Sequence, residues 1–321
     1  MKAIIRNEYG SPDVLHLVEI EKPAPAAGEA LVKVHAASIN MADRYLMRGR
    51  PLVARVMSGG LLRPRSNRLG ADVAGEVVAV GRDAHGFQPG DAVFADLAAC
   101  GFGGFSEYVT VPVQYLAHMP ANLTFEQAAA VPMAAVTALQ AIRDKAGVKA
   151  GQKVMVHGAS GGVGTFAVQM LKALGAEVTA VCSTRNVEMA RDLGADHVID
   201  YTCEDFARQG RHYDVIIAAN GNRSLADYRR ALLPGGMLVV TGGSMSQIFK
   251  AMAFGGKMAT ALSAEPSGAD LAEVAALIES GKIRPVIDAA YPLAETAAAM
   301  RYLETQHPRG KVILAVNGAH I

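Results

Sequence analysis

A glycine-rich turn is the part of the sequence whose residue types and spacing most directly indicate chemistry. It follows the apolar run Val154–His157, precedes the helix-like stretch Thr165–Lys172, and reads Gly158-Ala159-Ser160-Gly161-Gly162-Val163-Gly164. A turn between a strand and a helix can bind a dinucleotide, because the helix N-terminus presents unpaired N–H groups to a pyrophosphate. A Cβ at Gly161 would hold the backbone away from the phosphates, and one at Gly164 would push the helix off the strand. The turn residues that we predict to bind the cofactor are Ser160, Gly161, Gly162 and Val163.

The residues after the next predicted strand, Glu177–Cys182, indicate which dinucleotide is bound. An NAD site would place Asp or Glu there, roughly 20 residues past the glycines, to accept from the ribose 2′-hydroxyl. This chain instead has Ser183, Thr184 and Arg185. A hydroxyl and a planar cation are the donors that a 2′-phosphate needs, so Ser183 and Arg185 predict NADP(H). Ser183 or Thr184 could also cap a helix over 187–193, and one residue can serve both purposes.

Length, charge and cysteine content limit the class of protein. The 321 residues favour two domains, and the net charge of +1 argues against a generally basic nucleic-acid binder. The three cysteines, Cys100, Cys182 and Cys203, are too widely spaced for a disulfide framework or a cysteine zinc knuckle. No signal-like segment and no run of about 18 apolar residues is evident. We therefore expect a soluble protein in a reducing compartment, the cytoplasm, without an integral membrane segment.

The pattern of strands and helices changes along the chain. Residues 1 to about 120 are β-rich, with strand-like runs such as Ala30–Ala36 and Val73–Val80 separated by Pro/Gly turns. Residues Thr124–Gln127 then form a capping box that opens an alanine-rich helix. Strands alternate with helices from there on, which predicts a parallel, doubly wound sheet. Two strand-like runs near the end are expected to return to the first domain, 282–287 and 311–316.

The stretch Gly49–Arg68 differs from its surroundings, because it carries five arginines among apolar residues, namely Arg50, Arg55, Arg63, Arg65 and Arg68. Such a segment could face a membrane or a nucleic acid. The interpretation that we favour from the sequence is a solvated surface insertion near the mouth of an active site.

Several stretches, in order along nearly the whole chain, resemble the medium-chain dehydrogenase/reductase superfamily, and specifically its zinc-independent quinone oxidoreductase branch. The matching stretches are Gly10–Leu15, Asn40–Tyr45, Gly70–Gly75, Phe87–Val93, Gly158–Gly164, Leu193–Tyr201 and Gly310–Val312. The chain is most similar in texture to the group of reticulon-4-interacting mitochondrial proteins and their bacterial relatives. The resemblance implies an α/β fold with a cleft between two domains, and commonly a homodimer. The implied domains are a GroES-like, β-rich catalytic domain over 1–121, completed by 282–321, and a Rossmann domain over 122–281.

The resemblance also implies that zinc is not used. At the positions that correspond to the catalytic zinc ligands of the family's metal enzymes, this chain has Asn40, Ala71 and Met133. None of these is a good Zn²⁺ ligand. Without a Lewis acid, reduction of a conjugated acceptor is favoured over alcohol oxidation, because charge on a quinone or enone oxygen is delocalised and one hydrogen-bond donor can suffice.

Further site residues are implied by the resemblance alone. Asn40 and Tyr45 would lie near the nicotinamide and the substrate, where Tyr45 could donate to the carbonyl oxygen. Alternatively, Tyr45 packs while Asn40 and Asp43 cap a short helix. Tyr201 would either stack near the adenine or pack in the core. The resemblance adds these residues to the cofactor site: Thr137, Tyr201, Asn220, Gly242, Gly243 and Lys311.

These observations predict an NADPH-dependent, zinc-independent reductase of quinones or α,β-unsaturated carbonyls. Two alternatives fit the same sequence. One is an NADPH-binding structural or regulatory protein without significant turnover, and the other is a lipid-related enoyl reductase with a longer substrate pocket.

Overall fold

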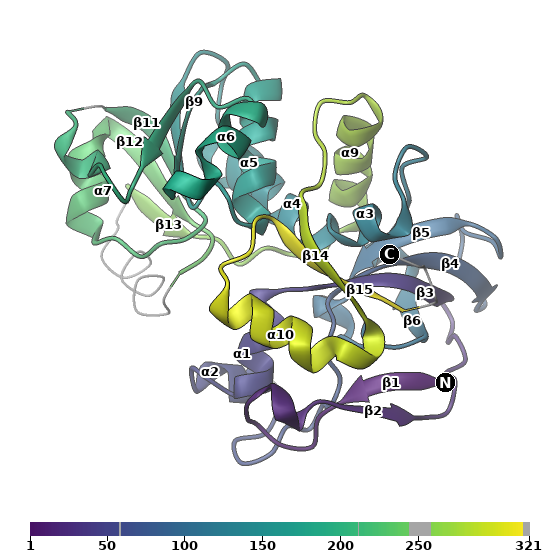
Figure 1. Ribbon diagram of the computed structural model, residues 1–321. Coiled ribbons are helices and arrows are strands. Elements are labelled where there is room, and N and C mark those ends of the chain that lie inside the picture. The colour runs from purple at the N-terminus through teal and green to yellow at the C-terminus, as the bar shows by residue number, and fades with distance from the viewer. Residues whose placement is uncertain (58, 211, 244–257, 317–321) are drawn as a thin grey trace. The chain divides into compact units, whose positions relative to one another are not determined.

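The computed structural model describes residues 1–57, 59–210, 212–243 and 258–316, and it divides into two compact units (Figure 1). Unit 1 comprises Met1–Met133, Pro266–Glu279 and Pro285–Ile321. Unit 2 comprises Ala134–Glu265 and Ser280–Arg284. Each unit contains its own cluster of buried apolar side chains.

Unit 1 is built on a seven-stranded sheet with β3 (Glu29–Ile39) at its centre. β3 pairs antiparallel with β4 (Asp72–Val80), β15 (Lys311–Ala315) and β6 (Tyr108–Pro112). Nearly all side chains of β3 are buried, as expected for a strand that has core on both faces. The other strands of the unit are β1 (Lys2–Ile5), β2 (His16–Glu19), β5 (Ala92–Asp96), β7 (Leu116–His118) and β14 (Ile287–Pro292). The β-rich first domain is therefore confirmed.

Five helices of unit 1 lie against or beside these strands. The first three are α1 (Met41–Arg48), α2 (Val53–Met57) and α3 (Phe125–Ala129), and the last two are α9 (Gly268–Glu279) and α10 (Thr296–Thr305). The contacts of α3 and α9 extend unit 1 beyond the residues that the sequence pattern assigned to the first domain. α3 packs on β3 and β4, and α9 lies so close to β7 that a Cβ on Gly268 would come within 2.4 Å of the Leu116 carbonyl oxygen.

The strand expected over 282–287 is wrong in its position. Residues 282–284 stay with unit 2, and β14 begins only at Ile287. The side-chain amide of Gln169 holds the backbone of Arg284 on both sides, with its Oε1 accepting from the Arg284 N–H and its Nε2 donating to the Arg284 carbonyl, each at 2.9 Å. Pro285 follows, and proline has no N–H for a strand ladder. At Arg284 the backbone therefore bonds to a side chain, and contact with β15 begins only at Val286, whose carbonyl accepts from the Lys311 N–H.

Unit 2 contains a six-stranded sheet in which every pair is parallel, in the order β10-β9-β8-β11-β12-β13. This is the strand order of doubly wound dinucleotide-binding sheets. The strands are β8 (Lys153–His157), β9 (Glu177–Cys182), β10 (His197–Asp200), β11 (Tyr213–Ala218), β12 (Leu232–Val240) and β13 (Ala259–Ala261). The helices are α4 (Pro132–Gln140), which continues as a π-helical turn over Ala141–Ala146, α5 (Gly162–Ala173), α6 (Val187–Asp192) and α7 (Leu225–Ala231). In Figure 1, α5 and α6 lie on one side of this sheet and α7 on the other.

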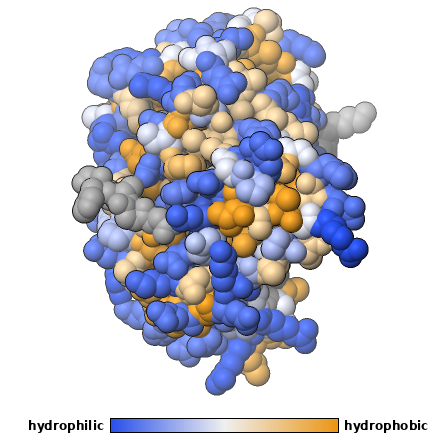
Figure 2. Space-filling view, turned by 90° about the vertical axis from the view of Figure 1, so that its right-hand side faces the viewer, coloured by the Kyte–Doolittle hydropathy of each residue, from blue (hydrophilic) through white to orange (hydrophobic). Residues whose placement is uncertain are grey.

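The surface is mainly hydrophilic on the face shown in Figure 2, where hydrophobic residues form limited groups among polar ones. Within the described residues, no helix combines the length and the apolar character that a bilayer span requires.

Candidate active site

The predicted dinucleotide turn lies in unit 2 between the end of β8 and the start of α5. Gly158 has a φ of +84°, a conformation that side chains rarely adopt, and a Cβ there would lie 2.7 Å from Cβ of Asn220. The Asn220 N–H donates to the His157 carbonyl at 3.1 Å. The predicted cofactor residue Asn220 is thus packed directly against the turn.

Gly164 and Gly161 of the turn have different reasons to be glycine. A Cβ at Gly164 would come within 2.1 Å of the Gly158 carbonyl oxygen, so α5 and β8 can approach each other only with glycine there. A Cβ at Gly161 would meet nothing closer than that same oxygen at 3.6 Å. The described residues leave space beside Gly161, at the N-terminus of α5, where N–H groups lack intrahelical partners. This space and these donors fit a pyrophosphate.

Ser183 and Arg185 lie just after β9, where a doubly wound sheet binds the ribose that carries the 2′ group of the dinucleotide. Arg185 is exposed, and the Ser183 hydroxyl accepts from the Asn186 side-chain amide at 3.1 Å. The Ser183 hydroxyl makes no capping hydrogen bond to the helical turn that follows it. We predicted two roles for the Ser183 side chain, helix capping and cofactor binding. The side chain does not cap the helix here.

An acidic residue that the sequence analysis missed stands beside this ribose end. Asp200 ends β10 and is aligned with Cys182 at the end of β9. Hydrogen bonds from the hydroxyls of Thr184 and Thr202 lower the pKa of Asp200, and Thr202 also donates its backbone N–H to the carboxylate at 2.9 Å. The strand order could have revealed Asp200, because the ends of adjacent parallel strands lie side by side although they are far apart in sequence.

The remaining predicted cofactor residues of unit 2 divide into exposed and packed ones. Tyr201 is 58% exposed, so core packing, one of its two interpretations, is wrong. Thr137 is buried in α4. Gly242 and Gly243 follow β12 and pack against the loop after β11, because a Cβ on either would come within 2.6 Å of a carbonyl oxygen there. In the part of the chain that the structure describes, the preceding Thr241 hydroxyl is buried without a hydrogen-bond partner, and the sequence analysis did not single it out.

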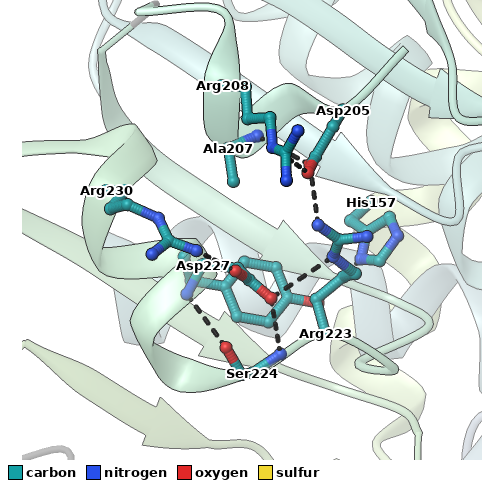
Figure 3. Close-up of polar contacts among 9 residues, drawn as sticks. His157, Asp205, Ala207, Arg208, Arg223, Ser224, Asp227 and Arg230 are labelled. Atoms are coloured by element: carbon teal, nitrogen blue, oxygen red, sulfur yellow. Dashed lines mark hydrogen bonds and ion pairs between the residues drawn. The ribbon is translucent and has the colours of Figure 1, made fainter.

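A polar network, in which only His157 and Tyr228 are buried, braces the strand ends near the turn (Figure 3). His157, the last residue of β8, is hydrogen-bonded through Nδ1 to the Tyr228 hydroxyl at 2.7 Å. Burial, together with the nearby Arg223 charge, lowers the pKa of His157 to about 4, so it is neutral at physiological pH. Arg223 lies between Asp205, at 2.6 Å, and Asp227, at 3.4 Å, as Figure 3 shows. The network connects the end of β8 to the segments on either side of β11.

In unit 1, Asp72 at the start of β4 is the centre of a second buried network. Its Oδ2 accepts from the Ser38 hydroxyl at 2.8 Å, from Asn40 Nδ2 at 2.9 Å and from Lys311 Nζ at 3.0 Å. Its Oδ1 accepts from the Met133 N–H at 2.8 Å. Asp72 is fully buried and Lys311 is 4% exposed. Four donors from three separate segments therefore satisfy one carboxylate.

The network brings together two predicted site residues, Asn40 and Lys311, that are distant in sequence. Lys311 Nζ also donates to Asn40 Oδ1, so both ends of the Asn40 amide are engaged within unit 1. Asp43 accepts from the Asn40 N–H at 2.9 Å, which makes the capping interpretation correct for Asp43. Tyr45 is half-buried on α1, with the Arg44 guanidinium 5.8 Å from its ring centroid.

Two further buried carboxyl groups have raised pKa values. Burial raises the pKa of Asp43 to about 7, although hydrogen bonds from the Asn40 and Gly70 N–H groups oppose the shift. Burial and the neighbouring Asp72 charge raise the pKa of Asp96 to about 8. Asp96 is the cross-strand partner of Asp72 in the β4–β5 pair, so the two carboxyl groups cannot easily both be ionised.

The positions equated with zinc ligands contribute other contacts to this network. Asn40 and the Met133 backbone both donate to Asp72, and Ala71 precedes it. Among the described residues, no group of three or more His, Cys, Asp and Glu side chains has an arrangement that could hold a metal ion. The residues at these positions therefore do not fit catalytic zinc.

Comparison with known proteins agrees with this architecture. A family model for the alcohol dehydrogenase GroES-like domain matches residues 26–121, and one for zinc-binding dehydrogenases matches residues 193–314. The mouse mitochondrial NAD(P)H oxidoreductase RTN4IP1 is 34% identical, over 98% of this chain and 89% of its own length. The 2-methylene-furan-3-one reductase of Solanum lycopersicum is 33% identical, over 98% of this chain and 79% of its own length. The solved structure of the quinone oxidoreductase from Coxiella burnetii is 31% identical, with a TM-score of 0.88 over 99% of both chains.

A GroES-like unit combined with a parallel sheet that carries this glycine turn defines a dinucleotide-dependent oxidoreductase. The chain belongs to the medium-chain dehydrogenase/reductase superfamily, in its zinc-independent quinone oxidoreductase branch. The resemblance found in the sequence is therefore confirmed. The relatives and the fold support oxidoreductase activity with a nicotinamide cofactor and a small-molecule substrate.

The two glycines of the turn give a matched pair of variants. Gly164→Ala should lower the free energy of unfolding by about 1–3 kcal/mol, because the added methyl group overpacks the contact between α5 and β8. For Gly161→Ala, the free energy of unfolding should stay within about 1 kcal/mol of the wild-type value. Its affinity for the nicotinamide dinucleotide should nevertheless fall about tenfold or more, which corresponds to about 1.4 kcal/mol. Urea denaturation and calorimetric titration measure the two effects. Wild-type cofactor affinity in Gly161→Ala would show that the space beside Gly161 is not the binding site.

The raised pKa of Asp96 predicts a pH-dependent stability. Between about pH 3.9 and pH 8, the Asp96 carboxyl keeps its proton in the folded state. In the unfolded state, where its pKa is about 3.9, it releases that proton. The contribution of Asp96 is therefore fully present below that pKa and is lost as the pH rises toward 8. Asp96→Asn removes this loss, so it should raise the unfolding free energy by roughly 3–4 kcal/mol more at pH 8 than at pH 5.

The control for Asp96→Asn is Asp43→Asn, measured by the same urea unfolding at both pH values. Both oxygens of Asp43 accept from backbone N–H groups, and an amide can replace only one of them. This variant loses a backbone hydrogen bond at both pH values, but the pKa of Asp43 is also raised, so its destabilisation should be larger at pH 5 than at pH 8. An effect of Asp96→Asn that does not change with pH would contradict the raised pKa.

Proposed function

We propose that this protein is an NADPH-dependent, zinc-independent reductase that transfers hydride to a quinone or to an α,β-unsaturated carbonyl. The observation that supports the proposal most is the space beside Gly161 at the N-terminus of α5, which no contact within the described chain explains. The names of the relatives, which include a quinone oxidoreductase and an enone reductase, support the same class of acceptor.

NADPH is proposed over NADH because of the groups after β9. Arg185 is exposed there and offers a planar cation, and Ser183 offers a hydroxyl. The carboxylate of Asp200 is nearby, but it accepts hydrogen bonds from Thr184 and Thr202. These bonds stabilise the ionised carboxylate, whose negative charge opposes a 2′-phosphate, so the proposed preference for NADPH depends on Arg185 and Ser183.

Side chains of this protein would position the reactants and would donate a hydrogen bond to the acceptor oxygen. When bound, the reduced nicotinamide supplies the hydride. Within unit 1, Lys311 donates to Asn40 and Asp72, which fixes the position of its ammonium group. Tyr45 is the proposed donor to the acceptor oxygen, on which negative charge develops as hydride arrives, and water completes the protonation where no side chain does so.

Location and assembly stay predictions. The sequence predicted a cytoplasmic homodimer, whereas the RTN4IP1 relatives carry mitochondrial names and several plant relatives carry chloroplast names. Compartment is therefore not carried over from them to this chain.

Steady-state assays with a panel of quinones, enones and alkenals test the proposed function. Loss of NADPH absorbance should match acceptor consumed, NADH should be used far less well, and EDTA should leave the rate unchanged. Tight NADPH binding without turnover on any acceptor would favour the structural or regulatory alternative. Stoichiometric zinc with activity lost on chelation would contradict the zinc-independent mechanism.

Variants at the ribose end test the choice of cofactor. Arg185→Ala should weaken NADPH by about ten- to 150-fold, the value of a charge-assisted hydrogen bond, and leave NADH nearly unchanged. Ser183→Asp should reverse the preference, because its carboxylate would repel the phosphate and accept from a free 2′-hydroxyl. Asp200→Asn should tighten NADPH by about two- to fivefold, as expected for removal of an exposed like charge. Titrations with both cofactors measure these effects, and equal weakening of both by Arg185→Ala would refute the assignment.

A variant at Tyr45 tests the proton donor. Tyr45→Phe should lower kcat by roughly ten- to a hundredfold, since it removes a single donor to the developing oxyanion. The dissociation constant for NADPH should not change. If kcat is unaltered with every active acceptor, Tyr45 is a packing residue.

A further inference from the structure

The arginine-rich segment between α1 and β4 presents an apolar surface that the reductase chemistry leaves unexplained. Five large apolar side chains within eleven residues are exposed: Leu52 by 70%, Val53 by 43%, Val56 by 66%, Leu61 by 63% and Leu62 by 89%. Single exposed apolar residues are normal on protein surfaces, but a group of them indicates an interaction site. We call this group, with its flanking arginines, the 50–65 surface.

The fold holds these side chains outward by anchoring the backbone beneath them. Arg55 of α2 donates to the Gly49 carbonyl at 3.0 Å and to the Leu61 carbonyl at 2.9 Å. The Tyr9 hydroxyl donates to the Gly60 carbonyl at 2.5 Å, and its ring lies 4.9 Å from the Arg55 guanidinium. Ala54 is buried. The loop is thus fastened to α2 and to the N-terminal segment from its inner side.

Three of the exposed apolar residues also share one helical face. Leu52 and Val53 precede Val56 by four and three positions, a spacing that places side chains on one face of a helical turn. Leu61 belongs to the loop that Arg55 ties back to this turn. The apolar residues of α2 and those of the loop therefore belong to one anchored segment.

The charge of the segment is of one sign. Seven arginines and no Asp or Glu lie between residues 44 and 71. Glu304 pairs with Arg44 and Arg48, and Arg55 is used internally. In the described residues, no carboxylate pairs with the four exposed arginines Arg50, Arg63, Arg65 and Arg68. Whatever covers the 50–65 surface must therefore be both apolar and anionic.

We propose that the 50–65 surface binds the face of an anionic phospholipid bilayer. Leucine and valine side chains would enter the boundary between headgroups and acyl chains, and the arginines would pair with lipid phosphates. A nucleic acid would use the arginines but not the exposed leucines. A second copy related by two-fold symmetry would bring the same arginines against each other. The attachment is peripheral, and it is independent of the proposed reductase activity.

A tryptophan probe tests insertion directly, because the chain contains no tryptophan of its own. Leu62→Trp should shift its fluorescence to shorter wavelength on mixing with vesicles of phosphatidylcholine and phosphatidylglycerol, and brominated acyl chains should quench it. Leu174→Trp is the matched control, since Leu174 is 42% exposed but belongs to unit 2 and is not part of the 50–65 surface. Its spectrum should not change.

Charge variants test the role of the arginines. Arg63→Gln with Arg65→Gln should weaken vesicle binding about 30-fold, at about 1 kcal/mol per arginine near an anionic surface. Arg82→Gln with Arg309→Gln removes two exposed arginines elsewhere in unit 1, and should weaken binding by less than about threefold. Flotation of the full-length protein with vesicles measures both. Thermal unfolding verifies that each variant is folded.

Three results would overturn the proposal. One is no shift of the Leu62→Trp spectrum with anionic vesicles, and another is equal binding to phosphatidylcholine alone. The third is self-association that Leu61→Ser with Leu62→Ser abolishes, which would assign the surface to a second copy of the chain.

Discussion

The buried ion pair between Asp72 and Lys311 is the constraint on which the first unit depends. A buried charge costs several kcal/mol unless it is paired and hydrogen-bonded, and Asp72 meets this condition only by accepting from Ser38, Asn40, Lys311 and Met133 together. These donors lie at the end of β3, just beyond it, on β15 and at the start of α4. Loss of any one would leave the carboxylate under-satisfied, so the network fixes how these segments meet. It also fixes the Asn40 amide, which the sequence analysis placed at the site without knowing its partners.

In the second unit the governing constraint is steric rather than electrostatic. Gly158, Gly164 and Gly243 each occupy a position where a Cβ would collide with neighbouring backbone. These contacts bring β8, α5 and the loops after β11 and β12 close together, and the neutral His157–Tyr228 pair supports the same region from below the turn. Gly161 differs, because the described part of the chain has room for a side chain there. A position that the fold does not require to be glycine, within a turn otherwise dictated by packing, points to a ligand.

The elements with local signals were predictable. The capping box at Thr124 is present, with Thr124 and Gln127 bonding each other's N–H groups, and the strand Glu177–Cys182 has the predicted bounds. These features depend on neighbours a few residues apart. The pairing of Asp72 with Lys311 joins residues 239 positions apart, and no local pattern marks it. Asp200 beside Ser183 was missed for the same reason, and the error at 282–287 arose because a glutamine side chain, rather than a strand, satisfies the backbone there.

Transfer of a labelled hydride tests the central claim most directly. NADPH deuterated at C4, prepared separately with each of the two stereochemical labels, would be incubated with the protein and an enone, and the product examined by mass spectrometry and NMR. The account predicts that one of the two labels appears on the β-carbon of the reduced enone, one deuterium for each NADPH oxidised, while the proton at the α-carbon comes from solvent. A protein that binds NADPH but forms no labelled product, or a product whose β-hydrogen comes from water, would contradict it.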